Sequence, residues 1–215
     1  ATMVTATGLA MASHVFITPV GVTASTSGSD LWPASNLIQG PGVGFAAAEP
    51  HLQTLSGAAG YWVTSAPGGF PSDYVAVAGT PVLIFDLGSD MNLGQVHTWG
   101  YDASNTNGVS QFSLRFATEA EGPAGFGSAV PYNPDFSMIR EQSAMQTSDF
   151  SQLVTARYVE FTALDNFFVA PGTEVPDRGG DRIGFGEISF SAVPEPSSSL
   201  LLGLGGLALA LRRRK

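Results

Sequence analysis

The feature that most constrains the fold is a series of short segments in which every second residue is apolar. In residues 111–116, Phe112, Leu114 and Phe116 alternate with polar neighbours. Such a period of two is typical of a β-strand with one buried face. The segments rich in β-branched and aromatic residues are therefore predicted to be strands: residues 15–20, 82–87, 96–101, 112–116, 158–164 and 183–190.

Turn residues separate these segments and predict how they connect. Asp86 and Gly88 follow one predicted strand, and Asn107-Gly108 is a strong turn dipeptide. Outside the C-terminal segment, no long stretch repeats with the period of a helix. The pattern predicts an all-β fold, an antiparallel β-sandwich of the jelly-roll type. Two long connections, residues 40–80 and 117–148, are expected to be loops that either bind a ligand or only cover the surface.

The C-terminal residues differ in composition from the rest of the chain. Val-Pro-Glu-Pro at 193–196 leads through three serines into residues 200–211, which carry no charge, and four cations close the sequence. An apolar segment followed by cations is typical of a membrane stop whose basic end stays in the cytoplasm. As a helix, the apolar residues would measure about 18 Å against about 30 Å of hydrocarbon. The segment therefore predicts a temporary anchor.

This segment resembles the PEP-CTERM sorting signal of exported bacterial proteins in its three parts and their order. The resemblance implies a short C-terminal hydrophobic helix, transient anchoring in the inner membrane, processing by an exosortase-type enzyme, and then a cell-surface or extracellular location. The residues assigned to sorting and processing are Val193, Pro194, Glu195, Pro196, Arg212, Arg213 and Arg214. Residues 1–12 are small and apolar and end in an A-x-A pattern, so they are interpreted as the remnant of a signal peptide; an ordinary N-terminus is the alternative.

Charge and cysteine content exclude several classes of function. Between residues 13 and 193, 17 acids stand against five arginines, so this part has a formal charge near −12. Such a charge disfavours nucleic-acid binding, which needs Lys and Arg to neutralise phosphates. The absence of cysteine excludes disulfides, thiolate catalysis and Cys-zinc sites. No G-x-S-x-G, H-E-x-x-H or P-loop motif is present, so no enzyme is predicted, although a glycosidase carboxylate pair stays open.

Several segments between residues 30 and 192 follow one another in a recognisable order. They are 33–40 (PASNLIQG), 61–64 (YWVT), 81–88 (PVLIFDLG), 96–101 (VHTWGY), 156–161 (ARYVEF) and 184–190 (GFGEISF). Together they resemble the discoidin, or galactose-binding-like, family, which includes the coagulation factor 5/8 type C domains and related carbohydrate-binding modules. The resemblance implies a β-sandwich jelly roll over residues 13–192, followed by the sorting tail at 193–215.

The same resemblance implies a sugar site and a calcium site. Sugar binding in the family uses loops at one end of the sandwich, with an aromatic ring for stacking and Arg, His or Asn for the hydroxyls. The candidates are His97, Trp99, Tyr101, Asn105, Asn107 and Arg115. A turn is the alternative for Asn107, and the core is the alternative for Trp99. The family's structural calcium implies Gln39 and Glu187 as ligands, and an amide in place of an aspartate at 39 puts the ion in doubt.

The sequence thus predicts an exported, non-catalytic envelope or extracellular-matrix protein that associates with exopolysaccharide through its β-sandwich. One alternative is a structural surface or matrix protein without specific sugar binding. The other is a polysaccharide hydrolase with an unrecognised site. No cofactor is expected apart from the structural calcium that the resemblance allows, and no nucleic-acid partner is expected.

Overall fold

A computed structural model describes residues 15–28, 32–39, 60–101, 104–141, 145–169 and 179–193. The predicted signal-peptide remnant at 1–12, the C-terminal helix and the processing residues beyond Val193 lie outside these ranges. Within the described residues, no helix has both the length and the apolar character needed to cross a membrane.

The described chain consists mainly of antiparallel strands, as the alternation predicts. The elements are β1 (Val15–Ile17), β2 (Gly21–Ala24), η1 (Ala34–Ile38), β3 (Trp62–Val63), α1 (Tyr74–Ala78), β4 (Val82–Trp99), β5 (Val109–Ala117), β6 (Asp135–Ser137), β7 (Met145–Asn166), β8 (Gly184–Phe185) and β9 (Glu187–Ala192). One sheet has the strand order β1-β9-β4-β7-β5-β6, with β2 also paired to β4, and β3 pairs separately with β8.

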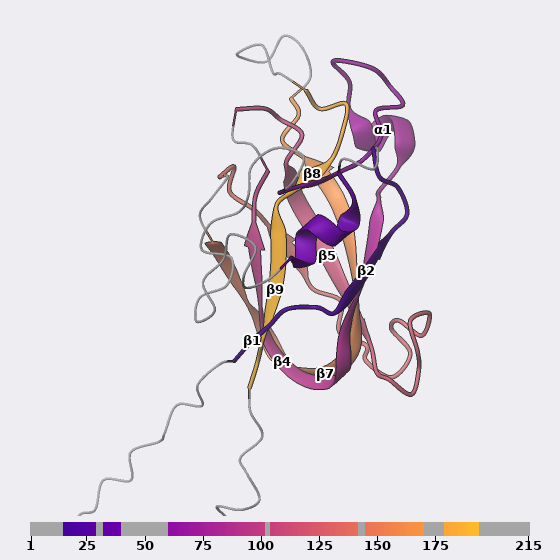
Figure 1. Cartoon of the computed structure of the whole chain (residues 1–215), viewed down its shortest axis with the longest axis vertical. Helices are drawn as coiled ribbons and strands as arrows, with labels where there is room; N and C mark the ends of the chain where they lie inside the picture. The colour runs from indigo at the N-terminus through magenta and orange to yellow at the C-terminus, as the bar shows by residue number, and fades with distance from the viewer. Residues whose placement is uncertain are drawn as a thin grey trace, which may run out of the picture.

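The long strands β4 and β7 turn this sheet into a two-layered sandwich. The first part of β4 pairs with β2, and its last part pairs with β9. Strand β7 accompanies β4 through both parts and pairs with β5 only over its C-terminal half. The register between β4 and β7 shifts after Asp86, which is the irregularity expected where a sheet bends. Figure 1 shows β4 and β7 curving together at one end of the molecule, here called the bend end.

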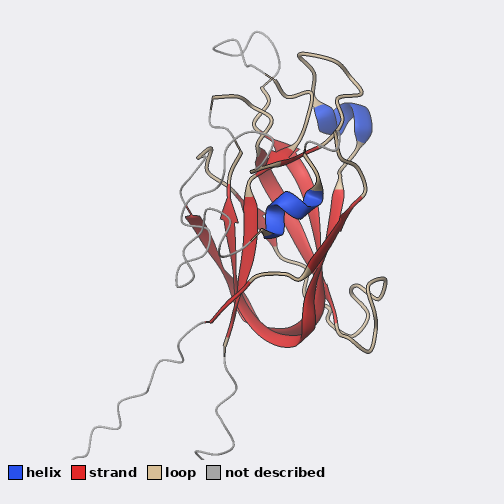
Figure 2. Cartoon of the chain, viewed as in Figure 1, coloured by secondary structure: helices blue, strands red, loops and turns tan. Residues whose placement is uncertain are grey.

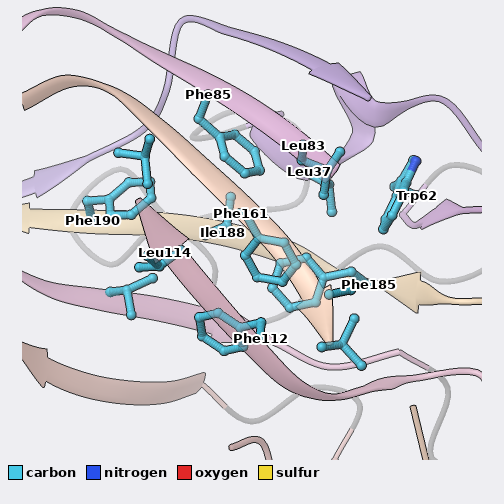
Figure 3. Packing of buried hydrophobic residues seen from close by; sticks show 14 of the residues in the cluster. Leu37, Trp62, Leu83, Phe85, Phe112, Leu114, Phe161, Phe185, Ile188 and Phe190 are labelled. Atoms are coloured by element: carbon cyan, nitrogen blue, oxygen red, sulfur yellow. The ribbon is translucent and has the colours of Figure 1, made fainter. Parts of the chain in front are cut away.

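The alternating apolar residues fill the space between the layers. Phe112, Leu114 and Phe161 are buried, and the rings of Phe112 and Phe161 stack with their centroids 4.7 Å apart. Each fully buried side chain of this size contributes about 2–3 kcal/mol of hydrophobic stabilisation. The strand periodicity therefore identified the core correctly. Figure 3 shows these rings together with other interior side chains, among them Leu37, Trp62, Leu83, Phe85, Phe185, Ile188 and Phe190.

An ion-pair cluster holds the two bent strands together at the bend end. The Arg157 guanidinium of β7 binds both carboxylate oxygens of Asp86, with Nε–Oδ1 at 2.9 Å and Nη2–Oδ2 at 3.1 Å, and its Nη1 lies 2.9 Å from Glu119 Oε1. This hydrogen bonding holds the pKa of the Asp86 carboxyl below its ordinary value. Asp86 also accepts the N–H of Gly88 at 2.8 Å. Asp86 thus joins the backbone at Gly88 to Arg157 on β7.

Three sequence predictions about the elements were wrong in detail. The predicted strands at 82–87 and 96–101 are one strand, β4, because a bulge replaces the expected turn. The connection at 40–80 contains β3 and the helix α1. Asp73 caps the N-terminus of this helix, where its side chain accepts the Ala76 N–H at 3.0 Å. The connection at 117–148 contains β6 and the start of β7. A five-residue helix is too short to show a helical period.

Candidate functional site

The end of the sandwich opposite the bend end carries most of the connections between strands, and we call it the loop end. Figure 2 shows loops and the short helix α1 gathered there, beyond the strands of both layers. Loops positioned by a rigid scaffold are common locations for binding residues. Described residues beside the strand ends that meet at the loop end include 25–28, 32–33, 64–78, 100–101, 104–108, 141, 167–169 and 179–183.

Two buried asparagines hold the segment that leads into β8. Asn107 Oδ1 accepts the Gly180 N–H at 2.6 Å. From the other side, Asn166 Nδ2 donates to the carbonyls of Gly180 at 2.9 Å and Arg182 at 3.1 Å. Gly180 has φ +80, and a Cβ there would collide with the Phe168 ring. Asn107 therefore positions backbone, whereas its side chain was predicted to contact sugar. The sequence offered no signal for Asn166 at the end of β7.

Tyr101 and Asn105 are the two predicted sugar ligands that the structure places at the loop end with partly exposed side chains. The Tyr101 ring packs edge-on against Tyr61, with centroids 4.7 Å apart. Asn105 Oδ1 accepts the Asn107 N–H at 2.8 Å, which forms the turn expected for this dipeptide region. Both side chains therefore sit on an ordered framework and remain partly exposed, and sugar binding by them stays a prediction.

His97 and Trp99 belong to the interior, and we revise the prediction that they contact a ligand. Both are in the last part of β4, with His97 3% and Trp99 0% exposed. His97 Nε2 lies 2.6 Å from Ser191 Oγ and Nδ1 lies 2.9 Å from Thr147 Oγ1. A serine beside a histidine at this spacing resembles an activated nucleophile. Ser191 is fully buried in β9, however, so a substrate cannot reach it.

Arg115 lies away from the loop end. It follows Val109, the first residue of β5, by six positions, which corresponds to about 20 Å along the strand. Its Nη1 is 3.1 Å from Glu160 Oε1, and its Nη2 donates to the Phe126 carbonyl at 2.7 Å. Arg115 and the loop-end candidates Tyr101 and Asn105 therefore cannot contact the same sugar unit.

The loop end also contains an aromatic–cation pair that the sequence analysis missed. The Arg182 guanidinium lies over the Trp32 ring, with Cζ 5.8 Å from the centroid. Arg182 Nη1 donates to the Thr64 carbonyl at 3.0 Å, and Nε is 3.8 Å from Asp181 Oδ2. Both side chains are partly exposed. Trp32 and Arg182 are 150 positions apart in the sequence, so no local pattern links them.

The two predicted calcium ligands occupy different environments. Glu187 of β9 is 1% exposed and faces Trp99 across the strand pair, and burial raises the pKa of its carboxyl to about 10. Gln39 Nε2 donates to Asn36 Oδ1 at 3.1 Å. Calcium takes six to eight oxygen ligands, several of them carboxylates. Among the described residues, no group of three or more Asp, Glu, His or Cys is placed to hold a metal ion, so calcium binding by Gln39 and Glu187 stays a prediction.

The C-terminal residues match a known family model. The model is described as "PEP-CTERM protein-sorting motif" and matches residues 192–215. The chain carries a PEP-CTERM sorting motif. The prediction made from the Val-Pro-Glu-Pro, apolar and basic parts of the tail is therefore confirmed, and it indicates export with C-terminal membrane anchoring before processing. No curated protein sequence matches the chain.

Solved structures show which known fold the body ahead of the PEP-CTERM motif shares. The C-terminal domain of a chitobiase from Bacteroides fragilis is 12% identical, with a TM-score of 0.52 over 84% of this chain and 100% of that one. A Clostridium perfringens module in complex with GalNAc-β-1,3-galactose is 13% identical, with a TM-score of 0.51 over 79% of this chain and 93% of that one. Another C. perfringens module, CBM32-3 from a family 31 glycoside hydrolase, is 12% identical. Its TM-score is 0.50 over 79% of this chain and 88% of that one. The body has the β-sandwich fold of these three domains, as predicted.

Proposed function

We propose that this protein is an exported, non-catalytic polysaccharide-binding protein of the cell envelope or extracellular matrix. In this proposal, residues 193–215 are the sorting tail, 13–192 the binding body and 1–12 the remnant of a signal peptide. The PEP-CTERM tail anchors the chain transiently in the inner membrane until an exosortase-type enzyme processes it near Pro194, Glu195 and Pro196. The body then associates with exopolysaccharide at the cell surface or outside the cell.

The observation that carries the binding proposal is the set of partly exposed aromatic and hydrogen-bonding side chains at the loop end. Tyr101 and Asn105 supply a ring and an amide, and the Trp32–Arg182 pair lies at the same end. Binding sites for small ligands combine apolar and aromatic surface with a few fixed polar groups. The fold supports this proposal as well, because it is also the fold of the C. perfringens module in complex with GalNAc-β-1,3-galactose.

Polysaccharide binding and its location can be tested with one pair of variants. In mild detergent, we expect the full chain to bind at least one neutral polysaccharide of a panel containing galactan, glucan and mannan. Tyr101→Ala should weaken that binding about tenfold, since ring contact and a hydroxyl partner are both lost. Arg115→Ala should leave the binding unchanged, and it is the matched control because Arg115 lies at a distance. Affinity electrophoresis measures both effects, with melting temperatures as the folding control.

The two results separate the alternatives left open by the sequence. A chain that binds no polysaccharide in the panel contradicts the binding proposal and favours a structural surface protein. A chain whose binding is weakened by Arg115→Ala and unaffected by Tyr101→Ala moves the binding surface from the loop end to the face of β5.

Processing of the tail can be tested in a bacterium that has an exosortase. We expect the parent chain to lose its C-terminal residues, and Glu195→Ala to stay at full length in the membrane fraction because the Pro-Glu-Pro is no longer intact. Ser198→Ala is the control, since it alters the linker and leaves Pro-Glu-Pro unchanged. Mass spectrometry of the purified chain and immunoblots of cell fractions give the readout. Normal processing of the Glu195 variant would contradict this assignment.

A further inference from the structure

The Trp32–Arg182 pair is held rigidly from several sides. The Arg182 carbonyl accepts from Asn166, and the next N–H, that of Ile183, donates to Thr64 Oγ1 at 2.9 Å. The Arg182 guanidinium itself is fixed by the Thr64 carbonyl at 3.0 Å. A group held in place before a ligand arrives loses less conformational entropy on binding. The protein itself therefore holds Arg182 in place beside Trp32.

Only glycine at position 28 leaves room for this arrangement. A Cβ on Gly28 would lie 2.7 Å from the Thr64 carbonyl oxygen and 2.9 Å from Arg182 Nη1. Both separations are too short for nonbonded atoms. The Gly28 N–H donates to the Val63 carbonyl at 2.7 Å, which draws this loop against β3. The guanidinium thus lies against the Gly28 and Thr64 loops, with its Cζ over the Trp32 ring.

The chemical groups gathered here match those that bind a sugar ring. Arg182 offers several N–H donors in a planar fork, of which one is used by Thr64. Trp32 adds apolar ring surface, and Asp181, which is 8% exposed, lies 3.8 Å from the guanidinium and offsets its charge from the buried side. Near them, the hydroxyls of Thr26 and Ser65 lie 3.4 Å apart and are partly exposed. Donor, acceptor and ring are the partners of neighbouring hydroxyls and of the C–H face of a pyranose.

The charges in and around the pair favour an uncharged ligand. Asp181 offsets the positive charge of Arg182 at 3.8 Å, and Arg115 and Arg157 are also paired with carboxylates. The part of the chain from 13 to 193 has a formal charge near −12 from 17 acids and five arginines. A polyanion approaching this surface would be repelled over distances of about 8 Å, the screening length at physiological salt.

We propose that Trp32 and Arg182 form a subsite for a neutral pyranose unit of a polysaccharide, separate from the Tyr101–Asn105 group. This proposal rests on the proposed polysaccharide-binding function and adds to it the residues and the ligand class. Segment 179–184 lies between the two groups, because Gly184 packs against Tyr101 and Arg182 packs against Trp32. Two such contacts would allow the loop end to hold neighbouring units of one chain.

The test uses the full chain in mild detergent, the panel of galactan, glucan and mannan, and alginate as a polyuronate. For the neutral polysaccharide that binds best, Trp32→Ala and Arg182→Ala should each weaken binding about tenfold, since a stacked ring or a charged hydrogen bond is lost. Arg182→Lys keeps the charge and loses the fork, so it should weaken binding less. Arg115→Ala is the matched control, because it removes another ion-paired arginine far from the loop end. Alginate should bind more weakly than the neutral polysaccharide.

Each outcome supports or overturns a defined part of the proposal. Binding to no polysaccharide at all removes the proposed function and this subsite together. If Trp32→Ala and Arg182→Ala bind the polysaccharide as tightly as Arg115→Ala does, the subsite is overturned. The proposed function stands in that case. Tighter binding to alginate overturns the neutral ligand class. If an alanine variant melts too low to be assayed, Trp32→Phe and Arg182→Lys take its place, and unchanged affinity in both overturns the subsite.

Discussion

Replacing Glu187 with glutamine should stabilise the protein at neutral pH by about 3 kcal/mol, and the gain should grow as the pH rises further. Burial raises the pKa of this carboxyl from 4.5 to about 10. Below about pH 4.5 the folded and unfolded states both carry the proton, so no stability is lost. Between pH 4.5 and 10 the unfolded state releases the proton and the folded state keeps it, so stability falls as pH rises. Each pH unit in this window costs about 1.4 kcal/mol, and glutamine removes this cost.

Urea unfolding at pH 5, 7 and 8.5 in the presence of EGTA measures this effect. The free energy of unfolding of the parent chain should fall across the series more steeply than that of Glu187→Gln. Asp135→Asn, which alters an exposed carboxyl on β6, is the control, and its free energy of unfolding should change with pH as that of the parent chain does. If the free energy of unfolding falls with pH equally steeply in the parent chain and in Glu187→Gln, Glu187 is ionised in the folded protein. Repeating the series with calcium tests the metal expectation, because a calcium-dependent rise in Tm that Glu187→Gln abolishes would establish the site.

Replacing Asn166 with alanine should lower the free energy of unfolding by about 3 kcal/mol. Its side chain is 3% exposed and makes three hydrogen bonds, donating to the carbonyls of Gly180 and Arg182 and accepting the Phe168 N–H at 3.0 Å. Each buried bond contributes about 1 kcal/mol, and the partners left without a bond add to the loss. The change should therefore also loosen the segment that leads into β8.

Urea unfolding and amide hydrogen exchange together check this expectation. The N–H groups of Gly180 and Ile183 should exchange faster in Asn166→Ala than in the parent chain, whereas those of β5 should change only with global stability. Gln95→Ala is a matched control, since Gln95 makes one exposed hydrogen bond, to Asp149, and should cost no more than about 0.5 kcal/mol. A loss of stability in Asn166→Ala as small as in this control would show that the segment is held by its other contacts.

The alternation in the sequence was enough to predict the sandwich and much of its core. Phe112, Leu114 and Phe161 sit on the buried faces of their strands because side chains along a strand point to opposite sides in turn. The first half of β7 escaped prediction because it is largely polar, with few β-branched or aromatic residues. Its neighbour β4 supplies the backbone partners that make this polar stretch a strand. Tertiary pairing of this kind cannot be recognised from a local pattern.

The candidate site was predicted less well than the fold, and the reason differs from residue to residue. His97 and Trp99 have side chains typical of sugar sites, and nothing in the residue types shows that β4 is covered at this position. The turn signal located the connection that contains Asn105 and Asn107, and sugar binding by Asn105 and Tyr101 stays a prediction. Arg182 and Trp32 were missed because their contact arises only when the two loops converge beside Thr64. Residue type thus predicts chemistry, and only the fold determines access.

The pairing of Val15 with Ala192 determines which way the molecule would face when tethered. Strands β1 and β9 place the entry and exit of the described body side by side near the bend end. In the tethered state proposed above, the bend end would point toward the lipid and the loop end outward. The part of β4 from Leu93 to Trp99, which pairs with β9, alone spans about 20 Å. A polysaccharide outside the membrane could then be captured before the tail is cut, and cleavage would release the protein with its ligand already bound.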